Sequence, residues 1–450
     1  MRVSIKSVVI FFLSCYLFLI SISGVITVVA YMSTRGLLLY KDFFAIAMPV
    51  LIFILLIARN PTVTPQFQSV IVLFLAMIGF SLVYILLTMI HGRFSFFRSL
   101  VQFRLELLTF ASFFCGAVLM LFSHEERLDI LMKMVRLYII FAVINALFAV
   151  AESTLAGALY SIIGYDPGPS LTKFGKEYGL ILRTIQGQFR AFGLQTGPFS
   201  LSEYLFFGLV LSPFVSLKNR RKFILLITLG IVCSTSKTAI VMALLYIMFL
   251  LTRRFFSLRF SLNIVTMATF ILGMFFYVTT TNYDVYQAIF PKENTYAENS
   301  ILFRTLGIES VKASPDYSPY IGAGYAVNGN AVVGDDNSNS IPLDSMYIYM
   351  LSNYGNIGII FLCIVAAFVL GILYQKVMKG VLPSVYLYWM ISLMMNFVYN
   401  NPLTNYPGYL FPIILSILIL SLRTSLPLEH LGEQCPKRIK PGYRQLNFKE

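Results

Sequence analysis

Two charged side chains lie close to apolar sequence in GQFRAFGLQTGPFSLSEYLFF, the stretch from Gly187 to Phe207. Arg190 precedes an apolar run, and Glu203 lies within that run. A guanidinium group can hold an anion through two parallel hydrogen bonds, and a carboxylate can accept the proton of a reacting hydroxyl. These residues therefore predict either a site for an anionic ligand or structural contacts. In the structural alternative, Arg190 contacts lipid phosphates or loop acids, and Glu203 pairs with Arg190 or Lys237.

Lys237 interrupts about 30 nearly apolar residues at the sequence STSKT, between Lys222 and Arg253. One continuous helix would place the ammonium near the bilayer centre, at a cost of roughly 2.5–3.5 kcal/mol. Two helices that meet at Ser234–Thr238 avoid this cost and keep both flanking basic loops on one side of the membrane. Each helix would have about fourteen apolar residues, or roughly 21 Å, against a hydrocarbon core of about 30 Å. We therefore expect the turn below the outer surface, with Lys237 inside the protein as an anion ligand.

Further candidate residues lie in two long segments, 156–197 and 282–344. Arg183 and Arg304 are arginines of the kind that binds an anionic ligand or glycan. Asp344–Ser345 directly precedes an apolar run, and either residue would cap a helix there. The Asp344 carboxylate would also face the outer side, where it could act as a base. The second segment carries six tyrosines, side chains that commonly stack on sugar rings: Tyr283, Tyr286, Tyr296, Tyr317, Tyr320 and Tyr325.

No motif for a cofactor accompanies these residues. The three histidines form no cluster with metal-ligand spacing. The phosphate-binding pattern GxxxxGK[ST] and the nucleophile pattern GxSxG are both missing. Asp335–Asp336 could ligate a divalent ion, but such a pair in a polar loop is more typical of a solvated turn. We therefore expect no cofactor and no metal, and an enzyme of this kind would need a substrate that arrives activated.

The elements that must position these residues are membrane helices. Hydrophobic residues make up 58% of the 450 residues, charged residues 12%, and the mean hydropathy is +0.78. Soluble domains carry about twice this fraction of charge. The pattern predicts an all-α, polytopic integral membrane protein with about 12 transmembrane helices and two long external loops. The predicted spans are 7–31, 43–58, 69–90, 101–122, 137–155, 196–216, two within 222–253, 262–281, 345–374, 381–399 and 409–422.

The distribution of lysine and arginine predicts the orientation. With both termini cytoplasmic, 21 of these residues lie on the cytoplasmic side and 13 on the outer side. This bias explains most of the net charge of +14 without a nucleic-acid partner. The predicted parts are N-terminal helices 1–155, a first external loop 156–197, central helices 198–281 with the STSKT turn, a second external loop 282–344, C-terminal helices 345–422 and a basic cytoplasmic tail 423–450.

The order of these motifs resembles the O-antigen ligase and polymerase superfamily. The match runs from about Arg190 to Gly358, and before it only hydropathy agrees. Its parts are RAFG, a span, a basic loop, STSKTA, Arg304 near the start of a long external loop, a P..G.G segment (Pro319, Gly322, Gly324), Asp344–Ser345, and a helix whose Gly355 and Gly358 would allow close helix packing.

The chain departs from the family pattern at two positions. Lys237 stands where arginine is usual, which keeps the charge but loses the bidentate fork. Asp344 stands where the ligase branch has a histidine, and neither long loop contains a histidine. The second departure favours the polymerase branch over the ligase branch.

The resemblance implies a metal-independent membrane glycosyltransferase at the outer face of a bacterial inner membrane. It also implies that the two external loops are periplasmic. Such a polymerase joins polyprenyl-diphosphate-linked oligosaccharide repeat units into O-antigen or a related surface polysaccharide, and its partners include a chain-length regulator and a flippase. Arg190, Lys237 and Arg304, with Arg183, would then hold diphosphate or glycan, while Asp344 or Glu203 would be the base.

Two alternatives stay open. An O-antigen ligase would transfer the finished glycan to lipid A core. A transporter or flippase of lipid-linked oligosaccharide would show two similar halves with intramembrane charges in both. The sequence shows no such duplication, and its anomalous charges cluster between Arg183 and Asp344.

Overall fold

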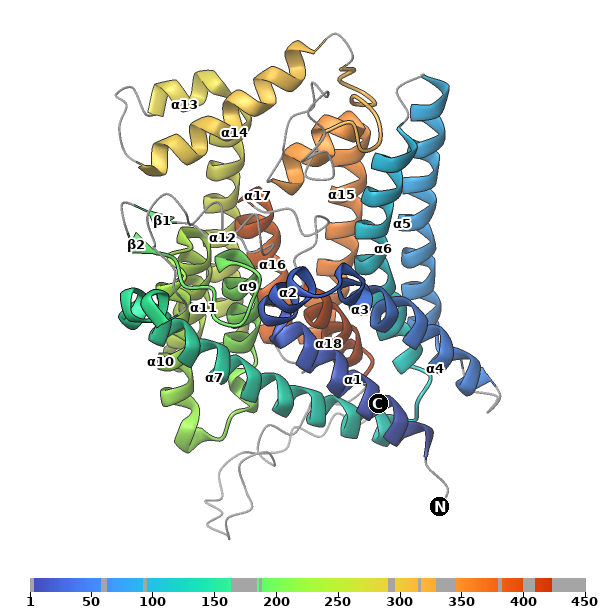
Figure 1. Ribbon diagram of the computed structural model, residues 1–450, viewed down its shortest axis with the longest axis vertical. Coiled ribbons are helices and arrows are strands. Elements are labelled where there is room, and N and C mark those ends of the chain that lie inside the picture. Colours follow the sequence, from blue (N-terminus) through green and yellow to red (C-terminus); the bar gives the residue numbers. More distant parts are fainter. Residues whose placement is uncertain are drawn as a thin grey trace.

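A computed structural model of the chain shows a bundle of helices (Figure 1). It describes residues 4–57, 63–91, 95–162, 184–185, 188–289, 296–314, 317–328, 345–378, 383–399 and 409–422. The first elements are α1 (Ile5–Ser21), α2 (Ser23–Met32), η1 (Arg35–Leu39), α3 (Tyr40–Asp42), η2 (Phe43–Ala47), α4 (Met48–Ile57), α5 (Pro65–Ile90), α6 (Phe96–Leu119) and α7 (His124–Ile162). Next come β1 (Thr184–Ile185), β2 (Gln188–Phe189), α9 (Pro198–Val210), η3 (Ser212–Phe214), α10 (Leu217–Cys233), α11 (Lys237–Phe255) and α12 (Leu258–Thr281). The last are α13 (Tyr283–Ile289), α14 (Tyr296–Ala313), α15 (Met346–Met378), α16 (Pro383–Ile391), η5 (Ser392–Asn396), α17 (Phe397–Tyr399) and α18 (Leu410–Leu420).

The prediction of an all-α polytopic membrane protein is confirmed. Within the described ranges, seven helices are long and apolar enough to cross a bilayer, and α1 with α2 makes an eighth if this pair, bent by 75°, counts as one span. Two apolar helices, α9 and α18, are shorter. The predicted number of twelve spans is not confirmed, because several of the predicted spans are short or broken helices.

The predicted break in the apolar stretch 222–253 is confirmed. α10 ends at Cys233, α11 begins at Lys237, and Thr235 between them has a φ of 49°. The two helices have 17 and 19 residues, more than expected, because the basic flanks continue the helices. They are roughly 26 and 29 Å long at 1.5 Å per residue. The 24-residue α12 rises past this turn towards α13 and α14 (Figure 1).

Polar contacts define two opposite ends of the bundle (Figure 1). At the first, the α1 end, Lys6 forms an ion pair with Asp129 at 2.9 Å, and Arg127 donates a hydrogen bond to the carbonyl that follows α18. The start of α1 and the end of α18 therefore lie together. At the second, the α14 end, Thr305 donates to the Thr279 carbonyl at 3.1 Å, so α14 lies across the end of α12.

Two helices that reach the α14 end are broken. A π turn, η5, separates α16 from α17. In α15, Gly355 has a φ of 61° and a ψ of −155°, so the helix is interrupted there. The segment 317–328 fills the gap, because the Ala323 N–H donates to the Ser352 carbonyl and the Asn356 N–H to the Pro319 carbonyl, both at 2.8 Å.

The role of the two glycines in α15 therefore differs from the predicted role, which was close packing between helices. A Cβ at Gly355 would lie 2.5 Å from the carbonyl of Tyr320, so this position receives a loop and not a helix. A Cβ at Gly358 would lie 2.4 Å from the side chain of Tyr354, within the same helix. Both glycines serve the break in α15, where the positive φ of Gly355 is open mainly to glycine.

Candidate functional site

The RAFG segment lies against the STSKT turn. Arg190 Nε donates to the Ser234 carbonyl at 3.2 Å, and the next backbone N–H donates to the Cys233 carbonyl at 3.1 Å. The Arg190 guanidinium also lies over the Phe199 ring, 4.7 Å from its centroid. Arg190 is buried, with 4% of its surface exposed. Two motifs that are distant in sequence are thus joined through one arginine.

Glu152 of α7 holds the same segment from the other side. One of its carboxyl oxygens accepts the backbone N–H groups of Phe192 and Gly193, at 2.9 and 2.8 Å. Gly193 has a φ of 58°, and a Cβ there would lie 3.0 Å from the Asn145 carbonyl. These contacts fix the path of the chain after Arg190. Sequence analysis missed Glu152, whose signal was one carboxylate at the end of a predicted span.

Glu203 lies in the core of the bundle, with 1% of its surface exposed. Its carboxyl group lies beside the side chains of Asn396 and Tyr409. Within the described part of the chain, neither carboxyl oxygen accepts a hydrogen bond of good geometry. The expected ion pair is not present either, because no salt bridge joins Glu203 to Arg190 or Lys237 among these residues. A buried carboxylate with so little compensation carries a desolvation cost that a ligand hydroxyl could offset.

The short helix α17 connects Glu203 to Arg304 and Ser345. Arg304 Nη2 donates to the Tyr399 carbonyl at 3.2 Å, and its guanidinium lies 4.9 Å from the centre of the Tyr399 ring. Ser345 Oγ donates to the Phe397 carbonyl at 3.4 Å. Asn396, beside Glu203, directly precedes α17. We call this group the α17 cluster: Glu203, Arg304, Ser345, Asn396 and Tyr399.

Ser345 is the cap of α15. Its hydroxyl accepts the N–H of Ile348 at 3.3 Å, which is the N-cap contact to the third helical residue. The capping role that the sequence left open between two neighbours is therefore filled by Ser345. Asp344 and Arg183 lie outside the described residues, so their predicted roles stay predictions.

Lys237 differs from its expectation. It is the first residue of α11, next to the buried Ser234 and Ser236, but its own side chain is exposed on the surface of the protein. The reason is the face of α11 on which Lys237 lies, because Ala239, Met242 and Ala243 are on the buried face and Lys237 shares the other face with the exposed Leu244. The prediction of an ammonium inside the protein is wrong, although the position of Lys237 at the turn is as expected.

A second buried carboxylate, Glu106 in α6, was missed by sequence analysis. It is 1% exposed, and its only signal was a single acid within a predicted span. Its carboxyl group accepts five hydrogen bonds. Burial and the nearby Glu106 carboxylate raise the pKa of the Tyr325 hydroxyl, so this hydroxyl stays protonated and donates. We call the group the Glu106 cluster: Glu106 with Ser81 (2.8 Å), Gln102 (3.1 Å), Tyr325 (2.8 Å), Tyr349 (3.1 Å) and Tyr354 (3.1 Å).

Charged groups are also present elsewhere in the N-terminal half. Arg104 of α6 binds Asp42 of α3 through two hydrogen bonds of 2.7 and 2.6 Å. The neighbouring Lys41 is buried, with 6% of its surface exposed. Together with Glu106, these residues show that anomalous charges are not confined to the region from Arg183 to Asp344. The expected clustering of charges is therefore incomplete.

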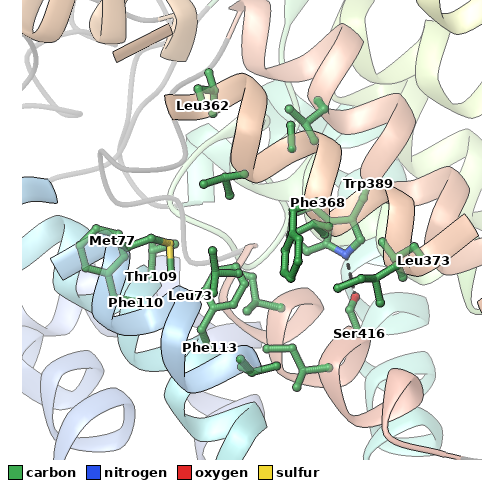
Figure 2. A pocket seen from close by; sticks show the side chains of 18 of the residues that line it. Leu73, Met77, Thr109, Phe110, Phe113, Leu362, Phe368, Leu373, Trp389 and Ser416 are labelled. Carbon is green, nitrogen blue, oxygen red and sulfur yellow. Dashed lines mark hydrogen bonds between the residues drawn. The ribbon is translucent and has the colours of Figure 1, made fainter. Parts of the chain in front are cut away.

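An apolar groove of about 370 Å³ lies between α5 and α6 on one side and α15, α16 and α18 on the other. In Figure 2, Leu73 and Phe113 face Phe368 and Leu373 across the space, and Trp389 donates to Ser416 at 2.9 Å. The groove is almost entirely lined by apolar groups. Its polar exceptions include Glu106, and its wall also includes Phe397 and Tyr409.

This groove meets the α17 cluster. The Phe397 carbonyl accepts a hydrogen bond from the Ser345 hydroxyl, and Tyr409 lies beside the Glu203 carboxyl. The side chains of Phe397 and Tyr409 pack together, with ring centres 5.6 Å apart. A ligand with a long hydrocarbon chain and a polar head would therefore find both environments side by side. The guanidinium of Arg304 could bind an anionic head, and a carboxylate could accept a proton there.

A comparison of the chain with protein families, with curated proteins and with solved structures finds no match. The resemblance to the O-antigen ligase and polymerase superfamily therefore rests on the motifs of the sequence alone.

Proposed function

We propose that this protein is a glycan polymerase of the O-antigen ligase and polymerase superfamily. It transfers a growing glycan from one polyprenyl-diphosphate carrier onto a new lipid-linked repeat unit, at the outer face of a bacterial inner membrane. The observation that carries this proposal is the apolar groove that meets the α17 cluster. It suits a ligand that is hydrocarbon along most of its length and polar at one end.

The chemistry needs few protein groups because the donor is already activated. A hydroxyl oxygen of the acceptor sugar attacks the anomeric carbon of the donor glycan. The bond between this carbon and the diphosphate oxygen breaks, and the polyprenyl diphosphate leaves with the electron pair. The hydroxyl proton passes to a carboxylate, for which Asp344 is the first candidate and Glu203 the second.

Arg190 and Arg304 suit the binding of the leaving diphosphate. Each guanidinium is held by a backbone carbonyl and an aromatic ring, which fixes the plane of the fork. Preorganised cations stabilise developing negative charge without reorganising during the reaction. Lys237, which is exposed on the turn beside Arg190, would meet the diphosphate from the surface of the protein and not from its interior.

The experiment that tests the proposal uses the purified chain in liposomes with lipid-linked repeat units from the host. We expect lipid-linked products longer than one repeat, formed without ATP. Arg190→Lys should lower the rate by roughly 10- to 100-fold, because a point charge cannot make the two parallel bonds. Arg254→Lys, at an exposed arginine of α11, is the matched control and should leave the rate unchanged. Products that never exceed one repeat would contradict the proposal.

A flippase is the second candidate, and the charges within spanning helices of the N-terminal half favour it. Lys41, the Arg104–Asp42 pair and Glu106 lie in helices of spanning length, as intramembrane charges do in many carriers. A flippase would move single repeats across the liposome membrane without lengthening them. The same preparation therefore separates the two functions by product length.

A further inference from the structure

At the α14 end, a second pocket of about 210 Å³ lies between the end of α5 and the segment 317–328. One wall is the C-terminal part of α5 and its cap, with Tyr84, Thr88 and His91. The facing wall is formed by Tyr317, Ser318 and the glycine-containing stretch 321–324. This pocket is separate from the apolar groove and from the α17 cluster, since it shares no lining residue with either.

The wall formed by the segment is held in place by backbone contacts. Gly322 and Gly324 have φ values of 72° and 117°. A Cβ at Gly322 would lie 2.4 Å from the backbone of Asn353, so only glycine allows this approach to the break in α15. The Tyr325 N–H donates to Thr88 Oγ1 at 2.6 Å, which ties the segment to α5. The pocket is therefore a preformed feature and not a gap between loosely placed loops.

Directly behind this wall, the Tyr325 hydroxyl donates to Glu106. The α5 wall is fixed in the same way, because the Tyr84 hydroxyl donates to the Tyr354 carbonyl at 3.0 Å. Both walls are thus anchored to α15 or to the Glu106 cluster. A rigid pocket loses little conformational freedom when a ligand binds, which favours even a weakly held polar ligand.

The lining selects the class of ligand. Among the lining residues that the structure describes, none is Lys, Arg, Asp or Glu, so the pocket does not suit a diphosphate. Tyr317 supplies a partly exposed aromatic ring, and Ser318 supplies a hydroxyl. Nδ1 of His91 lies 2.7 Å from the Leu87 carbonyl, so Nε2 is the ring nitrogen left for a ligand. Aromatic surface combined with a few uncharged polar groups matches a sugar ring, which has an apolar face and an equatorial edge of hydroxyls.

We propose that this pocket binds one sugar ring of the glycan, a saccharide subsite at the α14 end. The inference rests on the proposed function, because it identifies where the polymer or its acceptor repeat is held. Of the six tyrosines between residues 282 and 344, Tyr317 is the one that lines the pocket among the residues that the structure describes. Tyr325 is buried in the Glu106 cluster, and Tyr320 is 72% exposed but does not line the pocket.

The test measures binding of oligosaccharides released from the host surface glycan by mild acid. Ligand-observed NMR with the full chain in lipid nanodiscs gives a Kd that does not depend on catalysis. Tyr317→Ala and His91→Ala should each weaken binding by about tenfold, since an aromatic contact with its buried area contributes roughly 1.4 kcal/mol. Tyr317→Phe keeps the ring and should bind within about threefold of the unchanged chain, because a lost exposed hydrogen bond contributes less.

Tyr320→Ala is the matched control, because it removes an exposed tyrosine from the same segment outside the pocket. Its Kd should equal that of the unchanged chain. Three results would overturn the subsite: no oligosaccharide binding by the unchanged chain, undiminished binding by Tyr317→Ala and His91→Ala, or equal loss in Tyr320→Ala. A different result would contradict the proposed function: the chain would bind the oligosaccharide at this pocket but would not lengthen lipid-linked repeats in liposomes.

Discussion

At the scale of single residues, the two buried carboxylates contrast with each other. Glu106 and Glu203 are equally buried, but Glu106 accepts five hydrogen bonds whereas Glu203 has none of good geometry among the described residues. A buried charge is tolerated when hydrogen bonds replace its water, and it is costly otherwise. We therefore assign Glu106 to holding the fold together and leave Glu203 as a group that can take part in binding or chemistry.

The first prediction concerns Glu106→Gln. The amide cannot accept at its nitrogen, so at least two of the five donors lose their acceptor, and the free energy of unfolding should fall by about 2–4 kcal/mol. Thermal unfolding in detergent measures this effect. Tyr325→Phe removes one donor and should lower stability by about 1–2 kcal/mol. Equal melting temperatures for Glu106→Gln and the unchanged chain would show that the five contacts are not formed.

The second prediction separates Asp344 from its neighbour Ser345. Ser345 makes the N-cap contact, so Ser345→Ala should cost about 1 kcal/mol of stability. Asp344→Asn should leave stability unchanged, but if Asp344 is the base it should yield only single repeats at normal protein levels. Gel analysis of surface glycan and immunoblotting of the protein measure both quantities. Polymer of normal length from Asp344→Asn would transfer the role of base to Glu203.

At the scale of elements, the broken helices place the candidate residues. α15 is interrupted at Gly355 and receives the segment 317–328, while the π turn η5 leads into α17 beside Glu203. Non-helical backbone within a membrane protein is stable only where other protein groups satisfy it. Here the segment 317–328 supplies these groups to α15, so this segment and the bundle stabilise each other.

The third prediction tests the break in α15. Gly355→Ala would force a Cβ to within 2.5 Å of the Tyr320 carbonyl at a φ of 61°, so stability should fall by at least about 2 kcal/mol. Gly371→Ala is the matched control in the same helix, because a Cβ there meets no atom within 4 Å. That variant should be more stable by about 0.5–1 kcal/mol. Thermal unfolding of both variants measures these changes in stability. Equal changes in the two variants would contradict the break at Gly355.

The elements could be predicted from the sequence where hydropathy and charge act locally. The break at STSKT follows from one lysine within apolar sequence, and the structure confirms it. The exposure of Lys237 and the path of α15 could not be predicted, because both depend on which distant helices and loops pack against them. Glu106 and Glu152 were missed because a single acid in a span does not reveal its partners, which come from distant helices or loops.

At the scale of the whole molecule, the bundle has two distinct ends. The α1 end joins the first and last described helices, and the α14 end carries α14, the segment 317–328 and the pocket beside His91. The groove and the α17 cluster lie between the helices that connect these ends. A protein that works on lipid-linked glycan outside the cell requires the α14 end to face outward.

The fourth prediction is this orientation. In a chain without its native cysteines, Tyr320→Cys reports on the α14 end, because this position is 72% exposed. Glu125→Cys, at an exposed position near the start of α7, reports on the α1 end. A membrane-impermeant maleimide added to intact spheroplasts should label only the first. Labelling of Glu125→Cys alone would reverse the orientation and place the α14 end in the cytoplasm.

The measurement that tests the central claim most directly is the surface glycan of a host strain that lacks this gene. Gel electrophoresis resolves glycans that differ by single repeats. The proposed polymerase predicts glycan of one repeat in the deletion strain, with the full ladder restored by the unchanged gene. Free polymer that is not attached to lipid A core, or lipid-linked repeats that accumulate with no surface glycan, would contradict it and indicate a ligase or a flippase.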